Sequence, residues 1–233
     1  MLISLLEIQQ KEVFMKKYLE ILKTVKLFKG IKESDLMLLL GCLSGKLQHY
    51  EKNEIVFMSG ESINSFGIVL AGQVQIVQED FYGNRSILAN IGVSNLFGES
   101  FACAGIKNLP VSVIATAESD LLFIDCQRLA TPCVNSCAFH SQLIQNMLHI
   151  TAMKNISLMQ KIEFVTKRTT REKLLAYLSS EAQKAGSSCF SIPFNRQELA
   201  DYLSVDRSAM SAELGKLRDE GILKFHKNHF ELL

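Results

Sequence analysis

The stretch NRQELADYLSVDRSAMSAELGKLRDEGI, residues 195–222, decides the fold of the C-terminal part of this chain. Asn195 and Glu198 form a capping box, in which each side chain satisfies a free backbone donor at a helix start. A first helix, RQELADYL, is expected to end shortly before Asp206, which caps a second helix that stops at Gly221. Two short helices joined by so tight a turn predict a helix-turn-helix.

Two short runs behind the second helix, ILKFH and HFELL, flank Lys227-Asn228 and predict a small hairpin, which makes this a winged helix-turn-helix. The second helix of such a unit enters the major groove of DNA by its N-terminal end, where bulky residues would prevent close approach. Ser208 and Ser211 are small enough to allow this approach, and Arg207 can form bidentate hydrogen bonds with O6 and N7 of guanine. The alternative is a helical pair used only for packing or subunit contact. The turn spacing, the wing and the basic hinge before the module together favour DNA.

Charge in this part of the chain is nearly balanced, since residues 166–233 hold eleven Lys or Arg against nine Asp or Glu. Affinity for DNA must therefore come from where the cations lie, and a dimer on two half-sites would bind more tightly than a monomer. The residues that we assign to DNA binding are Arg196, Arg207, Ser208, Ser211, Lys216 and Lys227. Arg218 and Lys224 are further candidate cations.

Short β-branched runs occupy residues 54–124: EIVFM, SFGIVL, QVQIVQ, RSILANI, SVIATA and DLLFI. Glycines punctuate them at roughly ten-residue intervals, the rhythm of an antiparallel barrel or roll. QVQIVQ is expected to alternate strictly, with one face in water and the other packed inward.

Helical patterns flank these strands. Residues 15–47 have apolar residues at helical spacing, broken at Gly30 and restarted at Ser34. The later run FHSQLIQNMLHITAMKNISLMQKIEFV contains no proline or glycine and predicts a long helix. Its apolar seam steps by fours and threes, as in a two-stranded coiled coil. This seam comprises Ile144, Leu148, Ala152, Ile156 and Met159.

A second apolar stripe on the long helix runs through Leu143, Met147 and Ile150. Two stripes suggest one face for the barrel and another for a partner chain, so we expect a dimer helix. The alternative is a helix that lies only on its own barrel. After it, TKRTTREKLLAYL indicates a polar hinge and another helix, and AGSSCF indicates a Gly-Ser linker before the final module.

Composition indicates a globular protein, with 48% hydrophobic and 21% charged residues; the net charge of +1 argues neither for nor against nucleic acid. The longest apolar runs fall short of the roughly 20 residues of a membrane helix, and the N-terminus lacks the features of a signal peptide. We therefore expect a cytoplasmic protein without membrane contact, with Met15 as an alternative start to Met1. The six cysteines show no C-x-x-C spacing and are expected to be buried thiols. Cys133 and Cys137, four residues apart, give a weaker metal or redox hint.

The order helix, β-roll, long helix and winged helix-turn-helix resembles the Crp/Fnr family of bacterial transcription regulators. The resemblance rests on SGESINSFGIVLAGQVQIVQ in the roll, NLFGES at the pocket and the stretch 195–222. It implies an α+β protein with an N-terminal double-stranded β-helix (jelly-roll) effector domain at residues 1–130. A dimerisation helix at 131–165 and a DNA-binding domain at 166–233 would follow. It further implies a homodimer that binds near-palindromic double-stranded promoter DNA and responds to a small effector, with RNA polymerase as a further partner.

The resemblance also locates an effector pocket, which we assign to Gly98, Glu99, Ser100, Leu109 and Ser157. In members that bind cyclic AMP, a Gly-Glu pair is followed about ten residues later by an arginine that binds the cyclic phosphate. Gly98 and Glu99 match the pair, but the arginine position falls on Leu109. A buried phosphate without its cation would lose several kcal/mol, so the sequence argues against cyclic AMP.

Other cofactors of the family fit the sequence unequally. The oxygen-sensing branch holds an iron–sulfur cluster on closely spaced N-terminal cysteines, whereas the first cysteine here is Cys42 in a leucine-rich helix. Haem stays open, because His140 and His149 lie on or near the long helix, although a lone helix histidine is more often structural. The effector is therefore unknown, and no metal site is assigned.

Three functions compete. The leading one is a sequence-specific regulator gated by a small effector. A constitutive DNA-binding protein with a ligand-free roll, or a haem- or redox-responsive regulator, is the alternative. An enzyme of the metal-dependent cupin type would need clustered histidines on barrel strands, and only His49 of the five histidines lies near the roll. We therefore expect no enzymatic activity.

Overall fold

The computed structural model describes residues 17–82, 85–131 and 138–233. The chain divides into two compact units, Met1–Thr151 and Ala152–Leu233, and each is considered by itself. Two predictions lie outside the described residues: the alternative start at Met15, and the metal or redox hint at Cys133 and Cys137. Among the described helices, none is long and apolar enough to cross a membrane.

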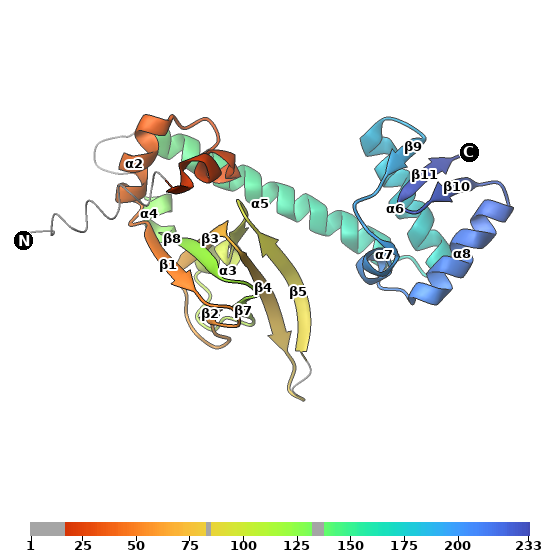
Figure 1. Cartoon of the computed structure of the whole chain (residues 1–233), viewed down its shortest axis with the longest axis horizontal. Helices are drawn as coiled ribbons and strands as arrows, with labels where there is room; N and C mark the ends of the chain where they lie inside the picture. Colours follow the sequence, from red (N-terminus) through yellow and green to blue (C-terminus); the bar gives the residue numbers. More distant parts are fainter. Residues whose placement is uncertain (1–16, 83–84, 132–137) are drawn as a thin grey trace, which may run out of the picture. The chain divides into compact units, whose positions relative to one another are not determined.

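The described strands of the first unit form two four-stranded antiparallel sheets, in agreement with the predicted roll (Figure 1). One sheet has the order β1 (Lys46–Tyr50), β8 (Ser119–Asp125), β3 (Ser65–Ala71) and β6 (Leu96–Phe97). The other has the order β2 (Ile55–Phe57), β7 (Ser112–Ala115), β4 (Gln73–Glu79) and β5 (Arg85–Gly92). The six predicted β-runs all form strands. The strands β1 and β6 were not predicted, because their short sequences carry no strong β-branched run.

The strict alternation expected of QVQIVQ is wrong. Strand β4 shifts register against β5 between Ile76 and Val77. Ile76 pairs with Ala89 and Val77 with Ile87, so the extra residue of this bulge, Leu88, lies in β5, and β4 keeps its register against β7. Val74 and Val77, three residues apart, are both buried, while Ile76 is only half-buried, so burial along β4 does not follow a period of two.

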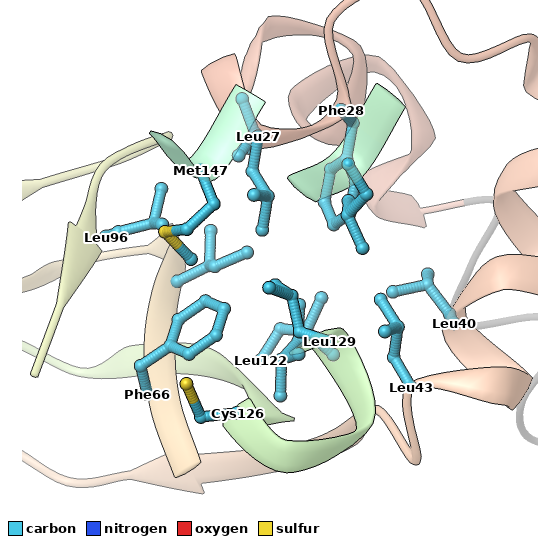
Figure 2. Packing of buried hydrophobic residues seen from close by; sticks show 14 of the residues in the cluster. Leu27, Phe28, Leu40, Leu43, Phe66, Leu96, Leu122, Cys126, Leu129 and Met147 are labelled. Carbon is cyan, nitrogen blue, oxygen red and sulfur yellow. The ribbon is translucent and has the colours of Figure 1, made fainter. Parts of the chain in front are cut away.

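Helices close one side of this roll. Residues 17–24 are helical, and the 3-10 turn η1 (Lys26–Phe28) and helix α2 (Glu33–Cys42) follow, as the sequence predicted. Two further helices, α3 (Glu99–Ala104) and α4 (Cys126–Ala130), were not predicted. Side chains from these helices and from strands β3, β6 and β8 meet in one apolar core. Figure 2 shows Phe28, Leu40, Phe66, Leu122 and Met147 converging there.

The long helix α5 (Ala138–Val165) is present as predicted. Its second stripe, Leu143, Met147 and Ile150, is buried in the core of the first unit, as expected of a face that packs on the roll. Asn146 shares this buried surface, and its Nδ2 donates to the backbone oxygens of Leu27 and Lys29, each at 2.8 Å. A buried amide must find such partners, so Asn146 ties α5 to η1.

The expectation of buried thiols is wrong for the described cysteines. Cys103 and Cys126 form a disulfide between α3 and the first residue of α4. Cys42 and Cys189 are free but exposed. Nothing in the spacing of these residues indicates the bond, because the pair is separated by 23 positions and meets only through the fold of the roll.

The second unit is a helical module with a small sheet. Its elements after α5 are α6 (Thr170–Ala185), β9 (Cys189–Ser191), α7 (Arg196–Leu203), α8 (Arg207–Asp219), β10 (Leu223–His226) and β11 (His229–Leu232). Leucines of α6, α7 and α8 share one core with Phe190 and Phe230 of the sheet. Tyr177 of α6 is buried among aromatic rings, and its burial raises the pKa of the phenol. The predicted winged helix-turn-helix is thus confirmed.

The Gly-Ser linker predicted at AGSSCF is wrong in its second half. Cys189–Ser191 forms β9, which pairs with β11 and gives a sheet with the order β10-β11-β9. Phe190 is buried and stacks with Phe230 at 6.1 Å between ring centroids. This sheet pairing outweighs the flexibility that Gly186 and the two serines suggested.

Gly72, between β3 and β4, is expected to tolerate no side chain. Its φ is +78°, and an added Cβ would lie 2.2 Å from the backbone oxygen of Glu118. Gly72→Ala should lower the free energy of unfolding by about 2 kcal/mol through this clash and the left-handed backbone. Gly92→Ala is the matched control, because no atom lies within 4 Å of its added Cβ. Urea unfolding of both variants checks this, and equal midpoints would contradict it.

Candidate nucleic-acid interface

Local hydrogen bonds define both ends of α7 and the start of α8. Asn195 accepts from the backbone nitrogens of Gln197 and Glu198, and the Glu198 carboxylate accepts from the Asn195 nitrogen at 2.7 Å, so the predicted capping box is present. Ser204 takes the left-handed conformation that ends α7. Asp206 then caps α8 by accepting from the Ala209 nitrogen at 2.8 Å. Ser204 and Asp206 thus fix where α7 ends and where α8 begins.

The N-terminal end of α8 presents small residues and one guanidinium to solvent. Met210, Leu214 and Leu217 are buried in the core and fix which face of the helix points outward. The exposed residues of the first turns are Arg207, Ser208, Ala209, Ser211 and Ala212. A helix with this start can approach a groove closely, and the positive end of its dipole favours phosphate.

The Ser211 hydroxyl is partly used within the helix. Its Oγ donates to the Arg207 backbone oxygen at 2.9 Å. In this conformation Ser211 can offer an acceptor to a ligand, such as a base amino group, but not a donor. Arg207 is left as the main hydrogen-bond donor at this end of α8, with Ser208 beside it.

Arg196, which the sequence assigned to DNA, lies against the wing. Its guanidinium carbon is 4.9 Å from the ring centroid of Phe225 and 5.2 Å from that of Phe230. Stacking of this kind stabilises a guanidinium over an aromatic face, and partial burial lowers the pKa of Arg196. The structure therefore places Arg196 where it joins α7 to the sheet, and not on the outer edge of the module.

The remaining predicted cations are exposed but partly paired. Lys216 Nζ lies 3.3 Å from a carboxylate oxygen of Glu213, and Lys224 Nζ lies 3.8 Å from one of Glu231. Lys227, at the tip of the β10–β11 hairpin, is exposed and has a positive φ of 53°. Arg218 pairs with the neighbouring Asp219. These surface pairs are weak and give way readily to a phosphate.

An ion cluster that joins α6 to α8 was not predicted. Arg171 Nη1 lies 3.3 Å from a carboxylate oxygen of Glu213, and Nη2 lies 2.5 Å from one of Glu220. The pairing raises the pKa of Arg171 and lowers that of Glu220. The partners are 42 and 49 residues apart, so no local pattern reveals them. A signal was available for the start of α6, because Thr169 and Glu172 form a T-x-x-E capping box.

Arg171→Gln is expected to lower the thermal midpoint of the second unit at neutral pH. The pKa of Glu220 is lower in the folded protein than in the unfolded chain, so the ion pair stabilises the fold at pH values above the unfolded pKa. This contribution is lost as the pH falls through the folded pKa and the carboxyl is protonated. The difference from the wild type should therefore shrink in acid. Lys184→Gln, which breaks an exposed pair with Glu181, is the control that should not shift the midpoint. A difference in thermal midpoint that stays constant from neutral pH into acid would contradict the assignment of this ion pair to Arg171 and Glu220.

The predicted dimer seam of α5 is largely exposed. Leu148 is 69% exposed, Ile156 48% and Met159 63%. Ala152 is also exposed, and Ile144 is half-buried. The exposed set is broader than predicted, because it also includes Met153, Leu158 and Ile162. Exposed apolar side chains gathered along one face of a helix, as in the seam, are typical of a surface that another protein covers. Met153 points away from the centre of that face.

The predicted effector-pocket residues fall in different surroundings. Gly98 has a φ of +76° and precedes α3, and Glu99, the first residue of α3, is buried. The Ser100 hydroxyl donates to a Glu99 carboxylate oxygen at 3.4 Å. Leu109 is buried in the core of the first unit, and its backbone nitrogen donates to the Glu61 oxygen at 2.9 Å. Ser157 belongs to the second unit, and its hydroxyl donates to the Met153 oxygen of its own helix.

Comparison with known families identifies both units. A model of the cyclic nucleotide-binding domain matches residues 47–133, and a model of the Crp-like helix-turn-helix domain matches residues 172–233. This chain belongs to the Crp/Fnr family of transcription regulators. Its second unit is therefore a DNA-binding domain, and its first unit is of the effector-binding type.

Relatives of this Crp/Fnr regulator are distant. The transcriptional activator protein FnrL of Cereibacter sphaeroides is 22% identical over 183 residues, which covers 75% of this chain and 71% of FnrL. The solved structure of CprK in complex with OCPA has a TM-score of 0.60 at 16% identity and covers 84% of this chain and 88% of CprK. CLP, the c-di-GMP-responsive global regulator of Xanthomonas campestris, has a TM-score of 0.53 at 16% identity and covers 84% of this chain and 97% of CLP. At these identities the solved structures establish the fold.

The histidines considered for haem differ in their surroundings. His140, in the first turn of α5, is buried, and its Nε2 lies 3.0 Å from the Arg128 oxygen and 3.2 Å from the Leu129 oxygen. His149 is exposed. His49 of β1 contacts Asp120 through Nδ1 at 2.8 Å. Across residues 17–82, 85–131 and 138–233, no three His, Cys, Asp or Glu side chains are grouped so that they could hold a metal ion.

Proposed function

We propose that this Crp/Fnr regulator acts as a homodimer that recognises a near-palindromic site in double-stranded DNA. The observation that carries the proposal is the exposed start of α8, where Arg207 and Ser208 stand clear of the core and Asp206 fixes the helix. Arg207 would read guanine, and Ser211 would accept a hydrogen bond from a base. Lys216 and Lys227 would contact phosphates. Arg196 would support the wing and contribute charge close to it.

Dimerisation is supported by the exposed seam of α5. At 100° per residue, Leu148, Ala152, Ile156, Met159 and Ile162 fall within about 120° of the helix circumference. A stripe of this width can pair with its copy as a two-stranded coiled coil does. Two copies would present two recognition helices, and productive half-site spacing is about 34 Å, one DNA turn, or a multiple of it. We propose residues 131–165 as the dimerisation helix and 166–233 as the DNA-binding domain.

The effector domain, which we propose at residues 1–130, is expected to respond to a ligand other than cyclic AMP. Leu109, at the position of the phosphate-binding arginine, has a buried apolar side chain whose backbone is bonded to the loop at Glu61. A cyclic phosphate placed there would meet no cation and would lose several kcal/mol. Gly98, Glu99 and Ser100 remain the candidate lining residues, with Ser157 as a candidate from the long helix.

A constitutive regulator with a ligand-free roll, and a haem- or redox-responsive one, are the competing proposals. The Nε2 atom of His140 already contacts two carbonyl oxygens, which weighs against that atom as a haem ligand. The disulfide in the roll favours the redox alternative. We further propose that the protein acts in the cytoplasm, contacts RNA polymerase and has no enzymatic activity.

The test is selection of genomic fragments by the purified full-length chain, followed by measurement of the mass of the complex. We expect an enriched fragment with two related half-sites, bound by two copies of the protein. A metabolite mixture that shifts operator affinity or the thermal midpoint would support a gated regulator and oppose the constitutive one. A monomer at micromolar concentration that shows no preference among fragments at low salt would refute the proposal.

A further inference from the structure

The disulfide in the first unit joins two helices that differ in exposure. Cys103 lies near the end of α3 and is exposed, whereas Cys126, the first residue of α4, is 6% exposed. Figure 2 shows the Cys126 sulfur among the apolar side chains of the core, close to Phe66. The Cα atoms of the two cysteines are 5.6 Å apart, within the usual range for a bridged pair. Cys103 is therefore the exposed residue of the pair, and Cys126 is the buried one.

We propose that Cys103 and Cys126 form a redox-active dithiol site that exchanges with low-molecular-weight disulfides and thereby changes affinity for DNA. The regulatory part rests on the proposed function as a DNA-binding protein. Disulfides in proteins that work in a reducing compartment are usually catalytic or redox-sensing and seldom structural. The site differs from the pocket residues Gly98, Glu99 and Ser100, although α3 carries members of both.

The difference in exposure assigns the two chemical roles. The Cys103 thiolate attacks one sulfur of the small disulfide, which forms a mixed disulfide and releases one thiolate. The Cys126 thiolate then attacks the Cys103 sulfur, which closes the protein disulfide and releases the second thiolate. The two cysteines lose two electrons and two protons, and the small disulfide becomes two thiols. Reduction runs in reverse, beginning with attack of a small thiolate on the sulfur of Cys103, the exposed residue of the pair.

The contacts of α4 connect this site to the long helix. Cys126 begins α4, and the carbonyl oxygens of Arg128 and Leu129 near its end both face Nε2 of the buried His140 in the first turn of α5. The disulfide fixes α4 to α3 on one side, while His140 fixes α4 to α5 on the other. Reduction removes the first attachment only. The state of the bond thus biases the position of α4 against the helix that we propose as the dimer element.

The experiment compares operator affinity of the full-length chain after dithiothreitol and after glutathione disulfide, with peptide mapping of the bonds formed. Mapping should join Cys103 to Cys126 after oxidation. The dissociation constants of the two states should differ about tenfold or more, the range of typical coupling between sites. Cys103→Ser, at an exposed position that leaves the core intact, should abolish the difference. The double variant Cys42→Ser and Cys189→Ser, which removes two exposed free thiols, should retain it.

Four results would overturn the inference. Equal affinity in both redox states refutes the redox proposal and leaves the proposed function standing. A response that persists in Cys103→Ser assigns the effect to another residue and refutes the site. A metal ion held stoichiometrically by both thiolates in the reduced protein makes the pair a metal site. Absence of specific DNA binding in both states refutes the proposed function itself, and with it any regulatory role of the pair.

Discussion

Met159→Glu is expected to convert the proposed dimer into monomers and to weaken operator binding by about a hundredfold or more. Met159 is 63% exposed in the single chain and lies on the proposed seam beside Ala152 and Ile156. In a symmetric pair each new carboxylate would face apolar side chains of the partner and approach its own copy, which is costly. Loss of the second half-site removes the gain from bivalent binding, which reaches about 10²–10⁴. Sedimentation and fluorescence anisotropy on the selected operator measure the two effects.

Met153→Glu is the matched control for this substitution. Met153 is the same residue type on the same helix and is 48% exposed. At 100° per residue it points about 120° away from Met159 and about 140° away from Leu148. Because it lies at the edge of the seam, about 60° from Ile156, it should disturb the sedimentation and the operator affinity far less than Met159→Glu does. Dimers that survive Met159→Glu, or that are lost equally in Met153→Glu, would show that the seam is assigned to the wrong face.

Arg207→Ala is expected to weaken operator binding by about tenfold to a hundredfold, the discrimination of one bidentate base contact, and to change binding to random duplex far less. Arg207 is the first residue of α8 and is exposed, and Asp206 holds the helix start by accepting from the Ala209 nitrogen. Removal of the side chain should leave this cap intact, so the fold should not change. Titrations of operator and random duplex at one salt concentration give both affinities.

Lys224→Ala separates base reading from simple attraction to phosphates. Lys224 is an exposed cation of the wing with one long ion pair to Glu231. Its loss should weaken binding to operator and random duplex by similar factors and should lower the salt dependence. If Arg207→Ala also weakens the two duplexes equally, direct base readout by Arg207 is refuted.

Local signals in the sequence predicted the elements whose determinants lie close together in the chain. Asn195 and Glu198 are three residues apart, and the capping box they predicted is present. The long helix followed from an uninterrupted run without glycine or proline. Strand β9 was missed, because it forms by pairing with the distant strand β11. The short helix α4 was missed although Asp125 caps it by accepting from the backbone nitrogens of Gln127 and Arg128. The bulge at Leu88 of β5 was missed because the register between β4 and β5 depends on both strands.

The candidate site residues also fall into two groups: features that local spacing predicted and features that it did not. The exposure of Arg207 and Ser208 followed from the apolar rhythm of Met210, Leu214 and Leu217, which a single helix imposes. The stacking of Arg196 on Phe225 could not be predicted from the spacing within one helix, because the two residues come from different elements. Local spacing also gave no indication that Arg171 reaches Glu220.

The sequence by itself determined the order of the elements, the helix-turn-helix with its wing and the membership of the Crp/Fnr family. Each of these depends on residue type at short spacing, where backbone geometry leaves few choices. Only the tertiary structure decided that Cys103 meets Cys126, that Arg171 holds α8, and that the seam of α5 is exposed while Leu143 and Met147 are buried. These features depend on which distant segments pack together, because burial and pairing are properties of the whole fold.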